Sequence, residues 1–316
     1  QVAADLPAKT EQVLAVELGA KHRKAYDQRL ARERQRILGL LEEDTAQSRF
    51  IALKALTTLR QMALDPALVD GGDGMEPEAA ESAGGGEAGE AAGGTGGSGK
   101  RAARGARAAK GKVVTAPAAG RGGPGRRPSP SAKVEVLVEY LGPILSEGHR
   151  ALVFSQFTRY LSGVREHLEA TGVRTAYMDG STPNRQEVID AFRAGQADVF
   201  LISLKAGGFG LTLTEADYVF LLDPWWNPQA EEQAVDRTHR IGQDKPVMVY
   251  RLVSADTIEE KVMALKEKKA ELFARVVEGA GEVETGGEGG TGAAVGSGGL
   301  SPAALTSAEI RELIEG

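Results

Sequence analysis

The sequence predicts an α/β fold in which helices cover both faces of a parallel sheet. Between residues 132 and 278, apolar runs of strand length alternate with amphipathic stretches of helix length, the order that builds parallel sheets. Polar and glycine-rich loops follow several of these runs, at the edge where such sheets bind ligands. The expected strands are 151–155, 174–178, 199–203, 218–222 and 247–253, and the helices between them are 159–171, 184–194 and 229–239.

Two more helices are predicted ahead of this region, after an extended segment at residues 1–16. Residues 17–43 and 48–64 carry apolar side chains at helical spacing. Asp65-Pro66 ends the second helix, because proline disfavours the helical conformation of the residue before it. These helices have no sheet of their own, so we expect them to pack on another part of the fold.

A glycine- and alanine-rich insertion at residues 70–131 has too few large apolar side chains to offset the entropy of ordering its backbone, so we expect disorder. Its acids lie in residues 70–99 and its bases in residues 100–127, so the net charge of −6 hides a basic segment. That segment is either a salt-sensitive DNA tether or a solvated, tolerated insertion. Gly94–Lys100 fits the start of a phosphate-binding P-loop, but no strand precedes it and Arg101 stands where Ser or Thr is needed. We interpret this match as chance.

Helices also begin and end the predicted sheet region. An amphipathic helix starts near residue 132 and is expected to kink or restart at Pro143. Asp256, with Glu259 three residues later, has the spacing of a capping box at the start of a long helix.

A short helix is predicted at the end of the chain, where Thr306 and Glu309 form a second capping box and Leu305 lies opposite Ile310 as a hydrophobic staple. We expect it to pack on this chain or on a partner. The predicted organisation is 1–69 as the end of a preceding domain with a helical protrusion, 70–131 as insertion, 132–278 as the α/β domain, 279–299 as linker and 300–316 as terminal helix.

The 316 residues include no cysteine, which excludes disulfides and thiolate metal sites. No apolar run approaches the roughly 20 residues that span a bilayer, so no membrane partner is expected. We expect a cytoplasmic protein, associated with the nucleoid if it is bacterial.

The strongest chemical signal lies in the predicted helix 229–239. Gln233, Arg237 and Arg240 are spaced to share one helical face, and guanidinium groups bind phosphate oxygens in a bidentate manner. Aimed across a cleft, such arginines could stabilise the charge that develops in phosphoryl transfer. The alternative is a surface salt bridge between Asp236 and Arg240.

Other candidate ligand groups follow the predicted strands. The loop Lys205–Gly210 offers backbone amides to an anion, although it could also be a tight turn. Trp225 and Trp226 could stack on a base or sugar, or anchor the core. The Asp-Gly-Ser-Thr run at 179–182 could be a turn, or could hold a backbone phosphate through Ser181, Thr182 and Arg185.

Three strings together closely resemble the Swi/Snf branch of superfamily-two helicases: SLKAGGFGLTLTEAD at 203–217, DPWWNP at 223–228 and QAVDRTHRIGQ at 233–243. They are similar to motifs V and VI of the second RecA-like lobe, and ALVFSQF at 151–157 is similar to motif IV. The resemblance extends over residues 5–69 and 132–278.

The resemblance implies a RecA-like lobe of a DNA-dependent ATPase that translocates on duplex DNA. ATP with Mg²⁺ would be held mainly by the first lobe of the same protein, and RNA polymerase or other DNA-bound proteins are possible partners. Arg237 and Arg240 would be arginine fingers. The implied nucleotide contacts are Gln233, Gly208, Gly210 and Asp236, and the implied DNA contacts are Ser155, Gln156, Ser181, Arg185, Ser203, Lys205 and Trp226.

This sequence departs from the family pattern in two ways. Thr212 stands where the family usually has asparagine, and no usable P-loop or Asp-Glu-x-His is present. We therefore expect the C-terminal half of a motor, inactive by itself. The alternatives are a non-catalytic DNA- or polymerase-docking module and an RNA helicase lobe. Gln243 argues against the RNA helicase, because DEAD-box proteins place arginine at that position.

Overall fold

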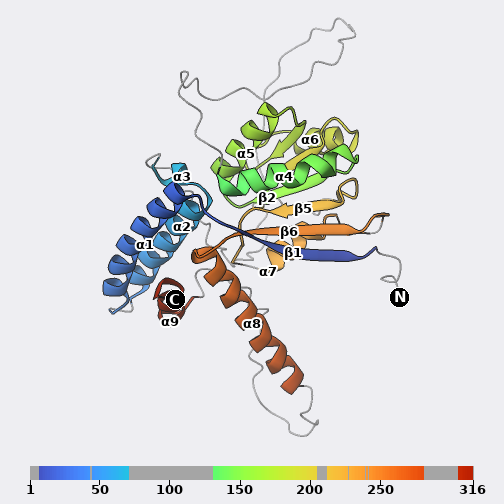
Figure 1. Ribbon diagram of the computed structural model, residues 1–316. Coiled ribbons are helices and arrows are strands. Elements are labelled where there is room, and N and C mark those ends of the chain that lie inside the picture. Colours follow the sequence, from blue (N-terminus) through green and yellow to red (C-terminus); the bar gives the residue numbers. More distant parts are fainter. Residues whose placement is uncertain are drawn as a thin grey trace, which may run out of the picture. The chain divides into compact units, whose positions relative to one another are not determined.

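The predicted parallel sheet is confirmed in the computed structural model, which describes residues 7–42, 45–70, 131–204, 212–226, 228–238, 240, 242–280 and 305–315. Within these residues, six parallel strands form one sheet in the order β1-β6-β5-β2-β4-β3 (Figure 1). The insertion and the linker lie almost entirely outside the described residues, as does the glycine loop. The strands are β1 (Lys9–Val16), β2 (Ala151–Ser155), β3 (Thr175–Met178), β4 (Val199–Ser203), β5 (Tyr218–Leu221) and β6 (Val247–Ser254).

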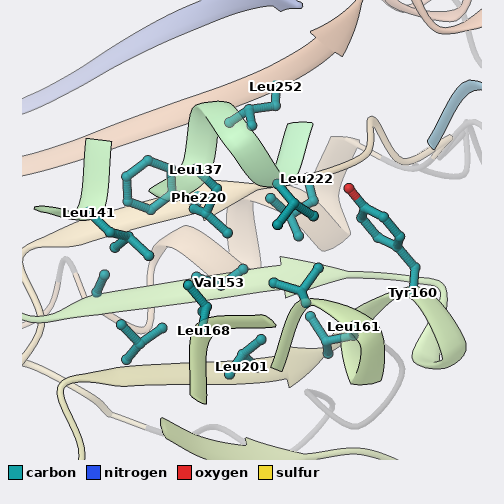
Figure 2. Packing of buried hydrophobic residues seen from close by; sticks show 14 of the residues in the cluster. Leu137, Leu141, Val153, Tyr160, Leu161, Leu168, Leu201, Phe220, Leu222 and Leu252 are labelled. Atoms are coloured by element: carbon teal, nitrogen blue, oxygen red, sulfur yellow. The ribbon is translucent and has the colours of Figure 1, made fainter. Parts of the chain in front are cut away.

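Helices cover both faces of the sheet because the central strands are apolar on both sides. Alternate residues, such as Leu152 and Val153 of β2, belong to two separate buried clusters. Helices α4 (Ala132–Ser146) and α5 (Thr158–Ala170) pack on the cluster that contains Val153, and Figure 2 shows their leucines against the strand residues. Helices α6 (Arg185–Arg193) and α7 (Pro228–Val235) supply the other cluster.

Residues 9–16, expected only as an extended segment, form the edge strand β1. It pairs in parallel with β6, from Lys9 opposite Val247 to Val16 opposite Ser254. Most of its side chains are exposed, and Val13 is 57% exposed. The first four residues of β1 are polar, and the apolar run 13–16 that follows is too short to mark the whole strand.

A helical layer forms a third apolar cluster beside the end of the sheet. Helices α1 (Ala20–Leu41), α2 (Ala46–Leu64), α8 (Ile258–Ala280) and α9 (Ser307–Glu315) contribute to it, and a short α3 (Ala67–Asp70) follows α2. The expectation that the first two helices pack on another part of the fold is confirmed. No helix among the described residues is both long and apolar enough to cross a membrane.

The helix ends test the capping predictions. In α9 the capping box is confirmed: the Thr306 amide donates to Glu309 Oε2 at 2.8 Å, and the Glu309 amide donates to Thr306 Oγ1 at 3.2 Å. In α8 it is wrong, because Asp256 has a left-handed backbone and Thr257 Oγ1 accepts the Glu259 amide instead. Helix α4 runs through Pro143 without a restart.

Candidate functional site

The two predicted finger arginines lie on a turn just beyond α7. The helix ends at Val235, earlier than expected, so Gln233, Arg237 and Arg240 are not on one continuous helical face. Gln233 is exposed, whereas Arg237 is only 5% exposed. The Leu213 amide donates to the Arg237 carbonyl at 2.8 Å and so ties this turn to the loop after β4.

Arg240 is held by backbone and hydroxyl groups. Its Nε donates to the Asp236 carbonyl at 3.0 Å, and its Nη1 donates to Thr212 Oγ1 at 3.4 Å. Arg193 of α6 donates to the Thr212 carbonyl at 2.7 Å. Thr212, the position that departs from the family pattern, thus connects α6 with the arginine turn.

The electrostatics of the turn favour an anion. Burial, together with the nearby positive charge of Arg240, lowers the pKa of Arg237 to about 10. Arg237 still carries its charge at neutral pH, but that charge is destabilised relative to water. A phosphate group brought to this turn would relieve the penalty, as at many functional sites where the pKa of a side chain is perturbed.

Gln243, which in the sequence only distinguishes helicase classes, is buried and fixes the arginine turn through hydrogen bonds. Its Nε2 lies 2.9 Å from the Ala216 carbonyl, 3.1 Å from that of Thr238 and 3.2 Å from that of Thr214. Its Oε1 accepts the Lys245 amide at 3.0 Å. A buried amide with this many partners fixes one loop relative to another, and no sequence spacing reveals it.

Asp223 lies just after β5 and forms buried hydrogen bonds with two of the predicted DNA contacts. Ser155 Oγ donates to Asp223 Oδ1 at 2.5 Å, and Gln156 Nε2 donates to Oδ2 at 2.6 Å. Burial raises the pKa of Asp223, although Arg60 and these hydrogen bonds favour the carboxylate. Ser155, Gln156 and Ser203 are all buried, so their placement does not support direct DNA contact.

Trp226 is a core anchor in this structure, which corrects its predicted role as a DNA contact. It is 1% exposed and belongs to the helical cluster. The Arg60 guanidinium of α2 lies 5.1 Å from its ring centroid and donates to the Pro224 carbonyl. A ring enclosed in this way has no face left for a base.

Glu231 fixes the first turn of α7. Its Oε1 accepts the Trp225 amide at 2.5 Å and lies 2.8 Å from Lys266 Nζ of α8. Its Oε2 lies 3.5 Å from Arg251 Nε of β6. The helix that leads into the arginine turn is therefore bonded to the sheet and to α8.

Lys133 and Glu259 form a buried ion pair at the carboxyl ends of two strands. Lys133 Nζ lies 2.5 Å from Glu259 Oε2 and donates to the carbonyls of Leu222 at 2.7 Å and Leu252 at 2.8 Å. All three ammonium protons have acceptors. Glu259, which the sequence predicts as a capping residue, thus joins α8 to α4 through its ion pair with Lys133.

The Asp-Gly-Ser-Thr run forms the predicted turn after β3. Asp179 Oδ1 accepts the Ser181 amide at 2.8 Å, and the Asp179 amide donates to Thr182 Oγ1 at 2.8 Å. Ser181 is exposed, and Arg185 donates to the Gly180 carbonyl at 2.9 Å. The turn leaves Ser181 exposed, with its Oγ donating to Asp179 Oδ1 at 2.7 Å.

Several predicted groups fall outside the described residues: Lys205, Gly208 and Gly210. Of the predicted nucleotide contacts, Gln233 and Asp236 are exposed. The described part of the chain contains no cluster of three or more His, Cys, Asp or Glu residues that could hold a metal ion.

Part of the chain is similar to known helicase-related proteins. Residues 132–242 match the helicase conserved C-terminal domain. The mouse SWI/SNF-related matrix-associated actin-dependent regulator of chromatin subfamily A member 1 is 42% identical over 152 residues, which cover 47% of this chain and 14% of that protein. The DNA repair protein RAD5 of Cryptococcus neoformans is 43% identical over 148 residues, or 45% of this chain and 12% of that protein. The chain thus spans about one seventh of these relatives.

Solved structures agree on the fold. The C-terminal part of the Fun30 ATPase domain aligns with a TM-score of 0.58 at 22% identity, over 82% of this chain and 90% of that one. The Sulfolobus solfataricus SWI2/SNF2 ATPase core, solved in complex with dsDNA, aligns with a TM-score of 0.58 at 24% identity, over 87% and 47%. Residues 132–242 therefore carry a helicase conserved C-terminal domain with a RecA-like fold, and the chain is similar in sequence to SWI/SNF-related proteins over about half of its length.

Proposed function

We propose that the intact protein is a DNA-dependent ATPase that translocates on duplex DNA, and that this chain supplies its arginine fingers. A first RecA-like lobe would hold ATP and Mg²⁺. This chain alone is expected to be inactive, because the usual P-loop and Asp-Glu-x-His are not in its sequence.

The arginine turn is the observation that carries this proposal. Arg237 is 5% exposed and Arg240 is held by the Asp236 carbonyl and Thr212. Two guanidinium groups of like charge lie close enough for Arg240 to lower the pKa of Arg237. Two neighbouring guanidinium groups are suited to binding the phosphates of an approaching polyanion.

Phosphoryl transfer is the reaction that such a turn serves best. Negative charge develops on the transferred phosphoryl group and its neighbours, and preorganised cations stabilise that charge without reorganising. Gln243 and Glu231 fix the two ends of the segment that carries the arginines, so its geometry is set before ATP arrives.

The remaining contacts follow from exposure. Gln233 and Asp236 are the exposed nucleotide contacts beside the turn, with Gly208 and Gly210 predicted to join them. Ser181 and Arg185 are the DNA contacts that the structure leaves accessible, with Lys205 predicted to join them. Serine hydroxyls and guanidinium groups bind phosphate oxygens without reading sequence, as translocation along any duplex requires.

Steady-state ATP hydrolysis by the intact protein tests the finger assignment. Arg240→Ala should reduce DNA-stimulated turnover by about 10³-fold or more, the range measured for arginine fingers, while ATP affinity changes little. Arg165→Ala is a matched control, because Arg165 forms an ordinary surface pair with Glu169 on α5. Its turnover should remain near that of the wild type.

Near-normal turnover in Arg240→Ala would reject the finger role. If the intact protein bound duplex DNA but never hydrolysed ATP, the chain would instead be part of a DNA- or polymerase-docking module.

A further inference from the structure

Helix α1 carries an excess of positive charge that the ATPase site does not use. It contains seven Lys and Arg residues against two acids, in a chain whose net charge is −6. The bases are Lys21, Arg23, Lys24, Arg29, Arg32, Arg34 and Arg36, and the acids are Asp27 and Glu33.

Some of these charges have structural partners. Arg23 donates to the carbonyls of Ala255 and Asp256, next to the start of α8. Arg29 pairs with the buried Glu33 at 2.8 Å, and Arg36 lies 3.9 Å from the same carboxylate. These cations hold α1 to its neighbours or share one acid.

Four others have no such partner in the described part of the chain; Arg34 lies on another side of the helix, and the remaining three share a face. Lys21, Lys24 and Arg32 are exposed, and no ion pair joins any of them to another described residue. Together with Gln28 and Gln35, they are spaced three or four residues apart along α1. The five side chains therefore share one helical face. We call this set the α1 stripe.

The stripe faces away from the core. The opposite face of α1 is buried through Tyr26, Ile37 and Leu41, which pack in the helical clusters with α2, α8 and α9. Figure 1 shows α1 alongside α2, as their shared cluster requires. An α-helix rises 1.5 Å per residue, so the stripe is about 21 Å long.

We propose that the α1 stripe binds the phosphate backbone of duplex DNA. The choice of DNA as the polyanion rests on the proposed function, whereas the surface itself rests on charge and exposure. Three uncompensated cations match a row of phosphates, and the glutamine amides can donate to phosphate oxygens between them. The stripe has no apolar member, and the apolar face that a membrane-surface helix would insert is already buried in the protein.

The salt dependence of DNA binding tests the stripe on this chain. We would measure the affinity for a 30-base-pair duplex between about 50 and 200 mM salt in the wild type and in the triple variant Lys21→Gln, Lys24→Gln, Arg32→Gln. Each phosphate contact contributes about 0.9 to the slope of log affinity against log salt, so the slope should fall in magnitude by about 2 to 3. Glutamine is a good helix former, so α1 should keep its helicity in circular dichroism.

A matched control removes the same net charge elsewhere. Arg174, Lys245 and Lys268 are more than half exposed, but each is compensated by a carboxylate, Asp198, Asp217 or Glu312. Their triple glutamine variant should change the slope much less than the stripe variant does. Equal changes in the two variants, or no change in the stripe variant, would overturn the proposal.

A vesicle-binding experiment distinguishes duplex DNA from an anionic lipid surface as the ligand of the stripe. Binding to vesicles with anionic phosphatidylserine should be weak and insensitive to the stripe; a loss confined to vesicles, with DNA binding unchanged, would also overturn the proposal. If Arg240→Ala hydrolyses normally but the stripe variant loses DNA affinity, the ATPase mechanism fails and the stripe stands. The reverse pair of results rejects the stripe alone.

Discussion

The Lys133–Glu259 pair and the arginine turn differ in the charge that lies beside each buried cation. Lys133 is buried, but its ammonium has a carboxylate and two carbonyls as acceptors. At the arginine turn, Arg237 and Arg240 place two charges of the same sign together. Burial lowers the pKa of both Lys133 and Arg237, so both sites incur a desolvation cost. At the first site a carboxylate lies beside the cation, whereas at the second a neighbouring cation adds to the cost. We propose that the phosphates of a ligand lower the second cost.

The largest effect on stability is expected at the buried ion pair of Lys133 and Glu259. Lys133→Met leaves the Glu259 carboxylate buried without its cation, which should lower the free energy of unfolding by about 3–5 kcal/mol. Urea denaturation of this chain measures the change. The double variant Lys133→Met, Glu259→Leu should recover much of the loss, because no unpaired charge remains. A single variant within about 1 kcal/mol of wild type would show that the pair is not a structural group.

Gln243 is a neutral residue that holds the arginine turn through buried hydrogen bonds. Gln243→Leu removes the donor to buried carbonyls and should cost about 1–3 kcal/mol. Hydrogen exchange of the Leu213 amide, which donates to the Arg237 carbonyl, should accelerate more than exchange in β2. Uniform acceleration in both places would indicate global destabilisation without a local clamp.

The sequence predicts the central strands of the sheet better than its edge. Strands β2, β4 and β5 were predicted within a residue because they are continuous apolar runs. The edge strand β1 was missed because an exposed strand needs no apolar pattern.

The site was harder to predict because its contacts are distant in sequence. The spacing of Glu259 favours a cap, while its partner Lys133 lies 126 residues away. Ser155, Gln156 and Trp226 match family motifs, but only tertiary structure shows that they face Asp223 and Arg60.

Replacing residues 71–130 with about eight glycine and serine residues should leave the Lys133–Glu259 pair and the arginine turn intact. Both ends of the insertion contact the start of α5: Arg159 donates to the Leu68 carbonyl, and Ser131 Oγ lies 2.9 Å from the Tyr160 hydroxyl. A shorter loop has a smaller closure entropy, so the free energy of unfolding should rise by about 1–2 kcal/mol. A loss of stability in urea denaturation would show that the insertion packs on the domain.

Asp179 gives the smallest effect and has a defined pH dependence. Burial alone would raise its pKa, but hydrogen bonds from Ser181, Tyr177 and Thr182 outweigh burial and hold it below 3.8. The carboxylate therefore stabilises the turn above pH 3.8, and this contribution disappears as pH falls through the lower folded-state pKa.

Comparison with Asp179→Asn isolates this charge. The variant should be less stable than the wild type by about 1 kcal/mol or less near neutral pH, and the difference should shrink as pH falls below 3.8. A difference that grows on acidification would have the wrong sign for a depressed pKa.

We propose that the arginine turn recognises the transition state of phosphoryl transfer more strongly than ATP itself. Binding of ADP with magnesium and aluminium fluoride, which imitates the planar transferred phosphoryl group, can be compared with ATP binding in the intact protein and its Arg240→Ala variant. We expect Arg240→Ala to weaken binding of the analogue by about 10³-fold while ATP affinity changes by less than about threefold. Equal losses for both ligands, or no loss for either, would contradict the account.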